Sequence, residues 1–383
     1  MRKVAACAVL VVAAIVGTLA RGGHEFPVYP GYYPHRIRIE TIAPDRAPDL
    51  LKTSKIQAYI GPDVSFGGSP PDSIGSFESL GSFVVIRLNP DSPLAKDEGS
   101  ACAVTRAIVR ELAARADKIT IHPYPITPFH GDYLDQVDLA EAAKARFQND
   151  FHASAPAPGR RVKVRATDSV ARDLLPPNWL TRGADWEAAV EEVSAAALVA
   201  AARTQVNGWV GPPWVRTGWF QATQLLQPSI DNPVDRDRVQ ANLRRLQTAD
   251  YRSAVERVNL ERDLISALTA SCRTLVAGYT LKREYVSVEY SAGIENIGFD
   301  SITGLNSSIF VRTAKLKDFP WNGVLSIGID TPPAATWNPI AGFNDNFGTL
   351  MWSAVGDPAA LPAPNDAGWI LNRVSDVRAV PNR

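Results

Sequence analysis

The segment from residue 118 to residue 138, KITIHPYPITPFHGDYLDQVD, carries the side chains best suited to chemistry. Histidine is scarce in this chain, and His122 and His130 flank a proline-rich loop that is followed by Asp132 and Asp135. Imidazole and carboxylate groups on a stiff loop suit zinc, iron or copper, because prolines reduce the entropy lost when ligands are held in place. The pattern predicts a transition-metal site made of His122, His130, Asp132 and Asp135.

A structural interpretation of the same loop stays open. A helix is expected from residue 134 to residue 147, so Asp132 lies where an N-cap is needed and Asp135 lies in the first turn. A histidine beside a proline-rich turn can also serve as a hydrogen-bond partner for the backbone. The spacing of the four residues matches no established ligand motif.

A second group of side chains lies in GWVGPPWVRTGWF, residues 208 to 220. Trp209, Trp214 and Trp219 recur every five residues, with Arg216 among them, in a segment that glycine and proline stiffen. Rigid indoles and one guanidinium suit an organic anion, a sugar face or an apolar patch on a protein partner. We predict a ligand- or partner-binding surface here, and packing of the tryptophans in the core is the alternative.

The common signatures of catalysis are absent from the sequence, which contains no GxSxG, GxxxxGK[ST], GxGxxG or HExxH motif. No catalytic residue is therefore assigned. The favoured interpretation is an exported accessory protein that binds a small organic ligand or a protein partner. The alternative is an exported metal-dependent hydrolase or oxidoreductase, in which a metal held by His122, His130, Asp132 and Asp135 polarises a bond or activates water.

Composition excludes several other classes. The chain has 383 residues, of which 45% are hydrophobic and 21% charged, so it is neither a disordered chain nor a protein with many membrane spans. Its 40 basic and 40 acidic residues cancel, which leaves no basic surface of the kind that nucleic acid requires. Nucleic acid is therefore not an expected partner.

The N-terminus predicts export. Met1, Arg2 and Lys3 precede an apolar run from residue 4 to residue 20, and Thr18 and Ala20 supply the small residues of a signal-peptide cleavage site. The mature protein is then periplasmic or secreted. An uncleaved anchor over residues 4 to 20 is the alternative, and it would be the chain's only contact with the membrane.

Export changes what the cysteines predict. With the leader removed, Cys102 and Cys272 remain, and an even number in an oxidising compartment favours a disulfide. Two buried free thiols that pack as small apolar residues are the alternative.

The predicted class is α+β, with an N-terminal α/β unit over residues 24 to 155. Period-two alternation predicts strands at residues 36 to 42, 56 to 60, 82 to 88 and 118 to 121, and helical spacing predicts helices at 100 to 116 and 134 to 147. Residues 67 to 82 are rich in glycine, serine and proline and are expected as a loop.

The second predicted unit covers residues 162 to 383. Helices are expected at residues 185 to 206, 235 to 248 and 251 to 276, and strands at 285 to 290, 307 to 316 and 322 to 330. The three strands would form a small antiparallel sheet. Long wrapping loops are expected to follow it.

Overall fold

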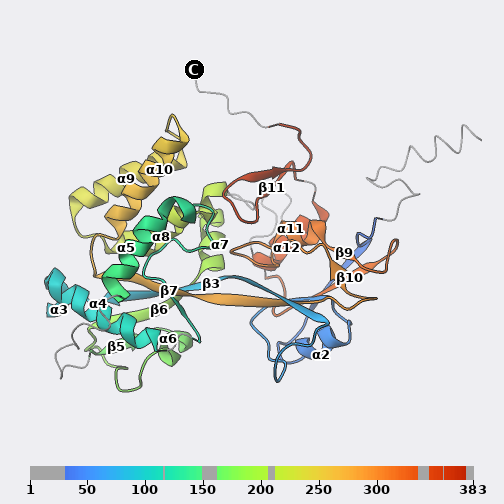
Figure 1. Cartoon of the computed structure of the whole chain (residues 1–383), viewed down its shortest axis with the longest axis horizontal. Helices are drawn as coiled ribbons and strands as arrows, with labels where there is room; N and C mark the ends of the chain where they lie inside the picture. The colour runs from blue at the N-terminus through green and yellow to red at the C-terminus, as the bar shows by residue number, and fades with distance from the viewer. Residues whose placement is uncertain are drawn as a thin grey trace, which may run out of the picture.

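Two long antiparallel strands, β3 (Ile74–Leu88) and β7 (Thr274–Ser287), run through the middle of the molecule (Figure 1). This computed structural model describes residues 31–114, 117–148, 162–205, 212–334, 345–356 and 358–376. In it β3 and β7 are central strands of an eight-stranded sheet, in the order β1-β10-β2-β7-β3-β6-β5, with β4 paired to β7. The other strands are β1 (Arg36–Thr41), β2 (Ala58–Ile60), β4 (Thr120–Ile121), β5 (Val164–Ala166), β6 (Ala188–Ser194) and β10 (Val324–Ile329).

The sheet is mixed. Strand β10 pairs in parallel with both β1 and β2, and β5 pairs in parallel with β6. The pairs β2 with β7, β7 with β3, and β3 with β6 are antiparallel. The β3 and β7 register shifts between Leu80 and Phe83 and again between Val84 and Val85, which are irregularities typical of β-bulges near the middle of the ribbon.

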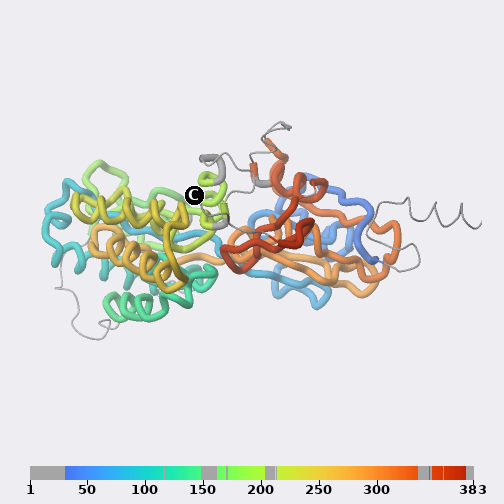
Figure 2. The backbone as a smooth tube through the Cα atoms, turned by 90° about the horizontal axis from the view of Figure 1, so that it is seen from above, coloured from blue at the N-terminus to red at the C-terminus, as the bar shows by residue number. Residues whose placement is uncertain are grey.

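The two ends of the β3 and β7 ribbon carry separate masses of structure, and Figure 2 shows them side by side. The helical half, residues 89 to 273, contains α3 (Pro93–Lys96), α4 (Glu98–Ala113), η1 (Tyr133–Gln136), α5 (Val137–Gln148), α6 (Ser169–Asp173), α7 (Ala195–Gln205), η3 (Pro213–Arg216), α8 (Gly218–Leu226), η4 (Gln227–Ser229), α9 (Pro233–Gln247) and α10 (Ala254–Leu268). The terminal half contains α2 (Ala47–Lys52), β8 (Ile294–Glu295), α11 (Ser308–Thr313), β9 (Lys315–Leu316) and α12 (Asn346–Val355). A C-terminal hairpin, β11 (Ala360–Pro362) and β12 (Trp369–Leu371), lies between the two masses in Figure 1.

Alternation along β3 explains how the helical half is built. Successive side chains of a strand point to opposite faces of the sheet. Phe83 and Val85 pack with α7, α8 and α10, whereas Val84 and Ile86 pack with α4 on the other face. The part of β3 that lies in the helical half is therefore buried on both faces, which is why residues 83 to 86 are continuously apolar.

The terminal half repeats this arrangement. Ile60 and Val286 belong to a core with Phe310 of α11 and Leu350 of α12. Tyr59, the neighbour of Ile60, points the other way and packs on the cluster that contains Leu51 of α2. Each half thus has apolar clusters on both faces of one continuous sheet.

The mixed class of α and β structure predicted from the sequence is confirmed, and two small antiparallel pairs, β8 with β9 and β11 with β12, are present. The strands expected at residues 285 to 290 and 322 to 330 also form, as the end of β7 and as β10. Both belong to the large mixed sheet. Residues after 330, expected as wrapping loops, also contain α12, β11 and β12.

Two predicted helices are partly wrong. Residues 188 to 194 form β6, and α7 begins only at Ala195, because β6 fills the gap between β3 and β5. The helix expected over residues 251 to 276 ends at Leu268, and β7 begins at Thr274. In both places strand pairing overrides a local pattern that fits a helix.

Two further predictions about local structure are wrong. Residues 308 to 313 form the short helix α11 in place of a strand, with Ser307 as N-cap accepting a hydrogen bond from the Phe310 N–H at 3.4 Å. Residues 74 to 82 belong to β3 and not to a loop. Gly81 lies inside this strand. Glycine suits the position because a Cβ there would stand 2.9 Å from Thr280 Oγ1 and 3.0 Å from the Thr280 carbonyl oxygen.

The other elements agree with their predictions. Strands β1 and β10 and helices α4 and α9 lie at the expected places within a few residues. The leader at residues 1 to 20 and the boundary near residue 155 lie outside the described residues. The division into two sequence domains therefore stays a prediction.

Candidate ligand-binding cleft

A cleft with a volume of about 520 Å³ opens where the two halves meet on the β3 and β7 ribbon. Its floor is formed by the middle of both strands, at Leu80 to Ser82 and Thr280 to Lys282. One wall comes from β6 and the start of α7 in the helical half. The other comes from segments of the terminal half, namely residues 60 to 63, Thr303, Asn306, Asp330, Thr331, Phe347 and Thr349.

A smaller pocket of about 70 Å³ adjoins the cleft, since both are lined by Thr303, Asn306 and Thr349. Val199 of α7, residues of α11 and α12, and Leu361 of the C-terminal hairpin close around it. Arg216 and Asp300 also line this pocket. The two adjoining cavities are lined by both polar and apolar surface, and such a mixture can orient a small molecule while burying its apolar part.

Carboxylates dominate the charged lining of the cleft. Asp63, Glu192 and Asp330 lie along it, and Lys282 is its one cationic side chain among the described lining residues. Lys282 Nζ donates a hydrogen bond to Glu284 Oε1 at 2.6 Å, so its charge is already matched by a buried carboxylate. The cleft therefore keeps an excess of negative charge.

Tyr285 fixes one of these carboxylates. Its hydroxyl donates to Asp63 Oδ1 at 2.8 Å. Burial, followed by this hydrogen bond, raises the pKa of Tyr285 to about 12, so the phenol stays protonated and continues to donate at neutral pH.

Arg216, a predicted binding residue, joins three parts of the chain. It forms a buried ion pair with Asp300 of the terminal half and donates to the carbonyl oxygens of Ala363 at 2.6 Å and Pro364 at 3.3 Å in the C-terminal hairpin. The Asp300 Oδ1 accepts from the N–H groups of Ile302 and Thr303, both at 2.9 Å. Arg216 thus ties the helical half to the terminal half beside the groove.

The tryptophans of the same motif lie mainly in the core. Trp219 is 2% exposed and packs with α7 and α10, and Trp214 is half-buried against it with ring centroids 6.2 Å apart. Trp209 lies outside the described residues. A binding role for the three tryptophans stays a prediction. Trp219 packs in the core of the helical half.

The two histidines are engaged with neighbouring groups. His122 Nε2 donates to the Ile126 carbonyl oxygen at 2.8 Å. His130 is 4% exposed, accepts from the Thr127 N–H at 3.0 Å through Nδ1, and donates to Gln221 Oε1 at 3.2 Å through Nε2. Burial lowers the pKa of both rings, so both are neutral at pH 7.

Asp132 caps a helix other than the one expected from the sequence. It makes no side-chain bond at η1 or α5, and its two carboxylate oxygens accept from the N–H groups of Gly218 at 2.9 Å and Trp219 at 3.0 Å, at the start of α8. Gly218 is required at this junction because a Cβ would stand 2.6 Å from Ile126 Cγ2. The carboxylate also matches the positive end of the α8 dipole.

The four predicted metal ligands do not form a compact group. Asp135 is directed at Arg257, with Oδ2 3.7 Å from Nη2. Within the described part of the chain, one group brings three ligand atoms of His, Cys, Asp or Glu within 4.8 Å of one another, and it contains Glu98, Cys102 and Cys272. Metal binding by the histidine loop stays a prediction.

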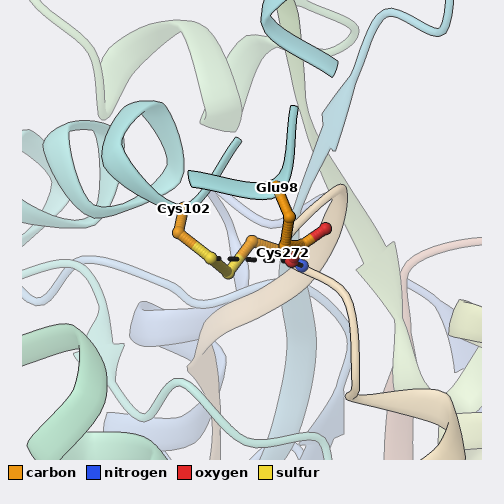
Figure 3. Close-up of side chains that lie close together, drawn as sticks. All are labelled: Glu98, Cys102 and Cys272. Carbon is orange, nitrogen blue, oxygen red and sulfur yellow. Dashed lines mark hydrogen bonds between the residues drawn. A yellow bond between two sulfur atoms is a disulfide. The ribbon is translucent and has the colours of Figure 1, made fainter. Parts of the chain in front are cut away.

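The predicted disulfide between Cys102 and Cys272 is confirmed, with the two Cα atoms 4.9 Å apart (Figure 3). It links α4 to the residues just before β7. Glu98 lies beside it and accepts from the Cys272 N–H at 2.7 Å through Oε1. Both sulfurs are bonded to each other, so neither is the thiolate that a metal would need.

Comparisons with known proteins give a distant likeness. No family model matches the chain, and no curated protein matches it. Among solved structures, it is similar to NikZ from Campylobacter jejuni in complex with Ni(L-His), at 13% identity and a TM-score of 0.36, over 67% of this chain and 56% of that one. It is also similar to the oligopeptide-binding protein AppA from Bacillus subtilis, at 12% identity and a TM-score of 0.39, over 72% of this chain and 59% of that one.

A third similar structure is the periplasmic EDTA-binding protein EppA, at 11% identity and a TM-score of 0.41, over 72% of this chain and 57% of that one. The chain therefore spans less than two thirds of the length of each of these proteins. The function proposed below rests on the cleft of this chain.

Sequence reasoning missed the residues that line the cleft. Asp63 follows β2, Glu192 lies in β6 and Asp330 follows β10, so three carboxylates far apart in sequence meet at one groove. Each lies at or near a strand of the central sheet. Their location at or near strands is the one sequence feature that could have indicated the cleft. It can be used only when the order of the strands in the sheet is known.

Proposed function

We propose that this chain is an exported binding protein that holds a small organic ligand in the cleft between its two halves. The observation that carries the proposal is the cleft itself, about 520 Å³ in volume, with a floor of rigid sheet and walls from both halves. A volume of this order suits a small organic ligand, and sites of this kind are largely preformed.

Export is part of the proposal. The apolar leader at residues 4 to 20 predicts it, and the disulfide supports it because structural disulfides persist in oxidising compartments. Among the described helices, none is both long and apolar enough to span a bilayer. A periplasmic or secreted location follows if the leader is cleaved, and attachment to the membrane follows if it is kept.

Binding is favoured over metal-dependent catalysis by the state of the predicted metal ligands. His130 and Asp132 are buried and use their ring nitrogens and carboxylate oxygens in hydrogen bonds that hold α8 and the loop that packs against it. A metal at this loop would have to displace those bonds.

The proposal is tested with the small molecules that co-purify from the native compartment, identified by mass spectrometry after denaturation. Ala196 lines the cleft from α7, so Ala196→Trp should fill it and remove the bound compound. Ala145→Trp, on the exposed face of α5, is the matched control and should keep it.

Two outcomes would count against the proposal. The first is an identical set of compounds in the wild type and both variants. The second is a stoichiometric metal that disappears in a His122→Ala/His130→Ala double variant, which would favour the metal-dependent enzyme.

A further inference from the structure

We propose that the ligand of the cleft is a small organic polycation, a molecule with at least two separated ammonium groups on an apolar backbone. This inference rests on the proposed function, because it names the chemical class that the same cleft would select.

The first argument is uncompensated charge. Within the described part of the chain, Asp63, Glu192 and Asp330 form no ion pair, although all three line one cavity. The single lysine of the lining is already paired with Glu284, whose side chain is 1% exposed. Three carboxylates that line the same groove repel one another, and a cationic ligand relieves that repulsion while it gains charge-assisted hydrogen bonds.

The second argument concerns how the charge is distributed. The carboxylate oxygens of Asp63, Glu192 and Asp330 do not all lie within 4.8 Å of one another, so the three side chains do not converge on one metal ion. Glu192 belongs to the wall that β6 forms, whereas Asp63 and Asp330 follow β2 and β10 on the opposite wall. Separated negative charges match separated positive charges, which an organic polyamine has and a metal ion does not.

The third argument is the apolar part of the lining. Leu281, which is 40% exposed, lies in the floor, and Phe347 lies in the wall of the terminal half. Leu281 supplies apolar contact for a methylene chain, and an aromatic ring such as Phe347 attracts an ammonium group to its face. Apolar side chains among separated carboxylates therefore match a ligand whose ammonium groups are joined by methylene segments.

The test uses the full mature protein and isothermal titration calorimetry, with spermidine as the probe. Tricarballylate and 1,8-octanediol serve as an anionic and a neutral comparison compound. We expect spermidine to bind, and its affinity to fall when the salt concentration rises, because screening weakens charge pairing. Glu192→Gln and Asp330→Asn should each weaken binding by about tenfold, since each removes one charge-assisted contact.

Glu295→Gln is the matched control, because Glu295 is exposed on β8 and does not line the cleft. It should bind spermidine like the wild type, and circular dichroism should show all variants folded.

Equal binding of the neutral or anionic compound, or unchanged affinity in Glu192→Gln and Asp330→Asn, would overturn the polycation proposal while the cleft remains the binding site. Strong binding of Ca²⁺ or Mg²⁺ that spermidine cannot displace would overturn it in favour of a metal. Spermidine binding that survives Ala196→Trp would refute the cleft itself, and with it the proposed function.

Discussion

Replacement of Arg216 by methionine should destabilise the protein more than any single change to a surface charge. The guanidinium is 9% exposed and its partner carboxylate on Asp300 is 6% exposed. Removing one member of a buried ion pair leaves the other charge without compensation, which typically costs about 3–5 kcal/mol. Asp300 keeps two backbone hydrogen bonds on Oδ1, so we expect the lower part of this range, about 3 kcal/mol.

The assay is urea unfolding followed by tryptophan fluorescence, arranged as a double-mutant cycle. Arg216→Met/Asp300→Asn should lose less than Arg216→Met alone, because the buried carboxylate charge is gone. Arg238→Met is the matched control. Arg238 pairs with Asp263, but these side chains are 46% and 39% exposed, so its loss should stay below about 1 kcal/mol.

A second measurement tests whether Arg216 holds the two halves together, separately from its effect on the free energy of unfolding. Arg216 also donates to the carbonyl oxygens of Ala363 and Pro364, so its loss should free the C-terminal hairpin. Limited proteolysis of Arg216→Met should then cut between residues 358 and 376 faster than in the wild type. If Arg216→Met loses no more stability than Arg238→Met and the hairpin resists proteolysis equally, the assignment of Arg216 as the tie between the halves is wrong.

Three further predictions concern stability. A Cys102→Ser/Cys272→Ser variant should unfold about 2–4 kcal/mol more easily, because the disulfide joins residues 170 positions apart, and urea unfolding under non-reducing conditions checks this. Asp132→Ala should cost about 1–2 kcal/mol in urea unfolding, since it leaves two N–H groups at the start of α8 without their carboxylate partner; a midpoint equal to the wild type would contradict the cap. Burial raises the pKa of Glu261 from 4.5 to about 7, so the unfolded chain releases this proton at lower pH than the folded one. Stability should therefore fall as pH rises from 4.5 to 7, by at most about 3 kcal/mol, and Glu261→Gln should flatten this dependence in unfolding measured across that range.

The elements that could be predicted from the sequence are those whose local signals agree. Helix α9 begins after Asn232, which caps it by accepting from the Val234 N–H at 3.0 Å, and its buried positions Val239, Asn242 and Leu246 follow helical spacing. Strand β1 alternates between exposed and half-buried side chains over most of its length, as an edge strand does. In these places propensity, capping and periodicity point to the same structure.

The failures occur where partners distant in sequence decide the structure. Residues 188 to 194 are rich in alanine and glutamate, which favour a helix, yet they pair with β3 over seven residues. Gly81 is locally typical of a loop, but in the structure its missing side chain allows close approach of β3 to β7. A single sequence shows the glycine without showing the strand that it faces.

The candidate sites show the same division. The sequence marks the histidine loop and the tryptophan motif as separate features, and the structure packs them on each other, since His130 donates to Gln221 and Asp132 caps α8. The histidines and tryptophans of these two motifs therefore mark a place where buried polar groups need hydrogen-bond partners. Such a place requires specific side chains, just as a binding site does. The cleft is lined instead by ordinary residues, and its carboxylates look like solvated surface charges in the sequence. Strand order alone brings Asp63, Glu192 and Asp330 to one groove, so the site that best supports a function is made by topology and not by any local motif.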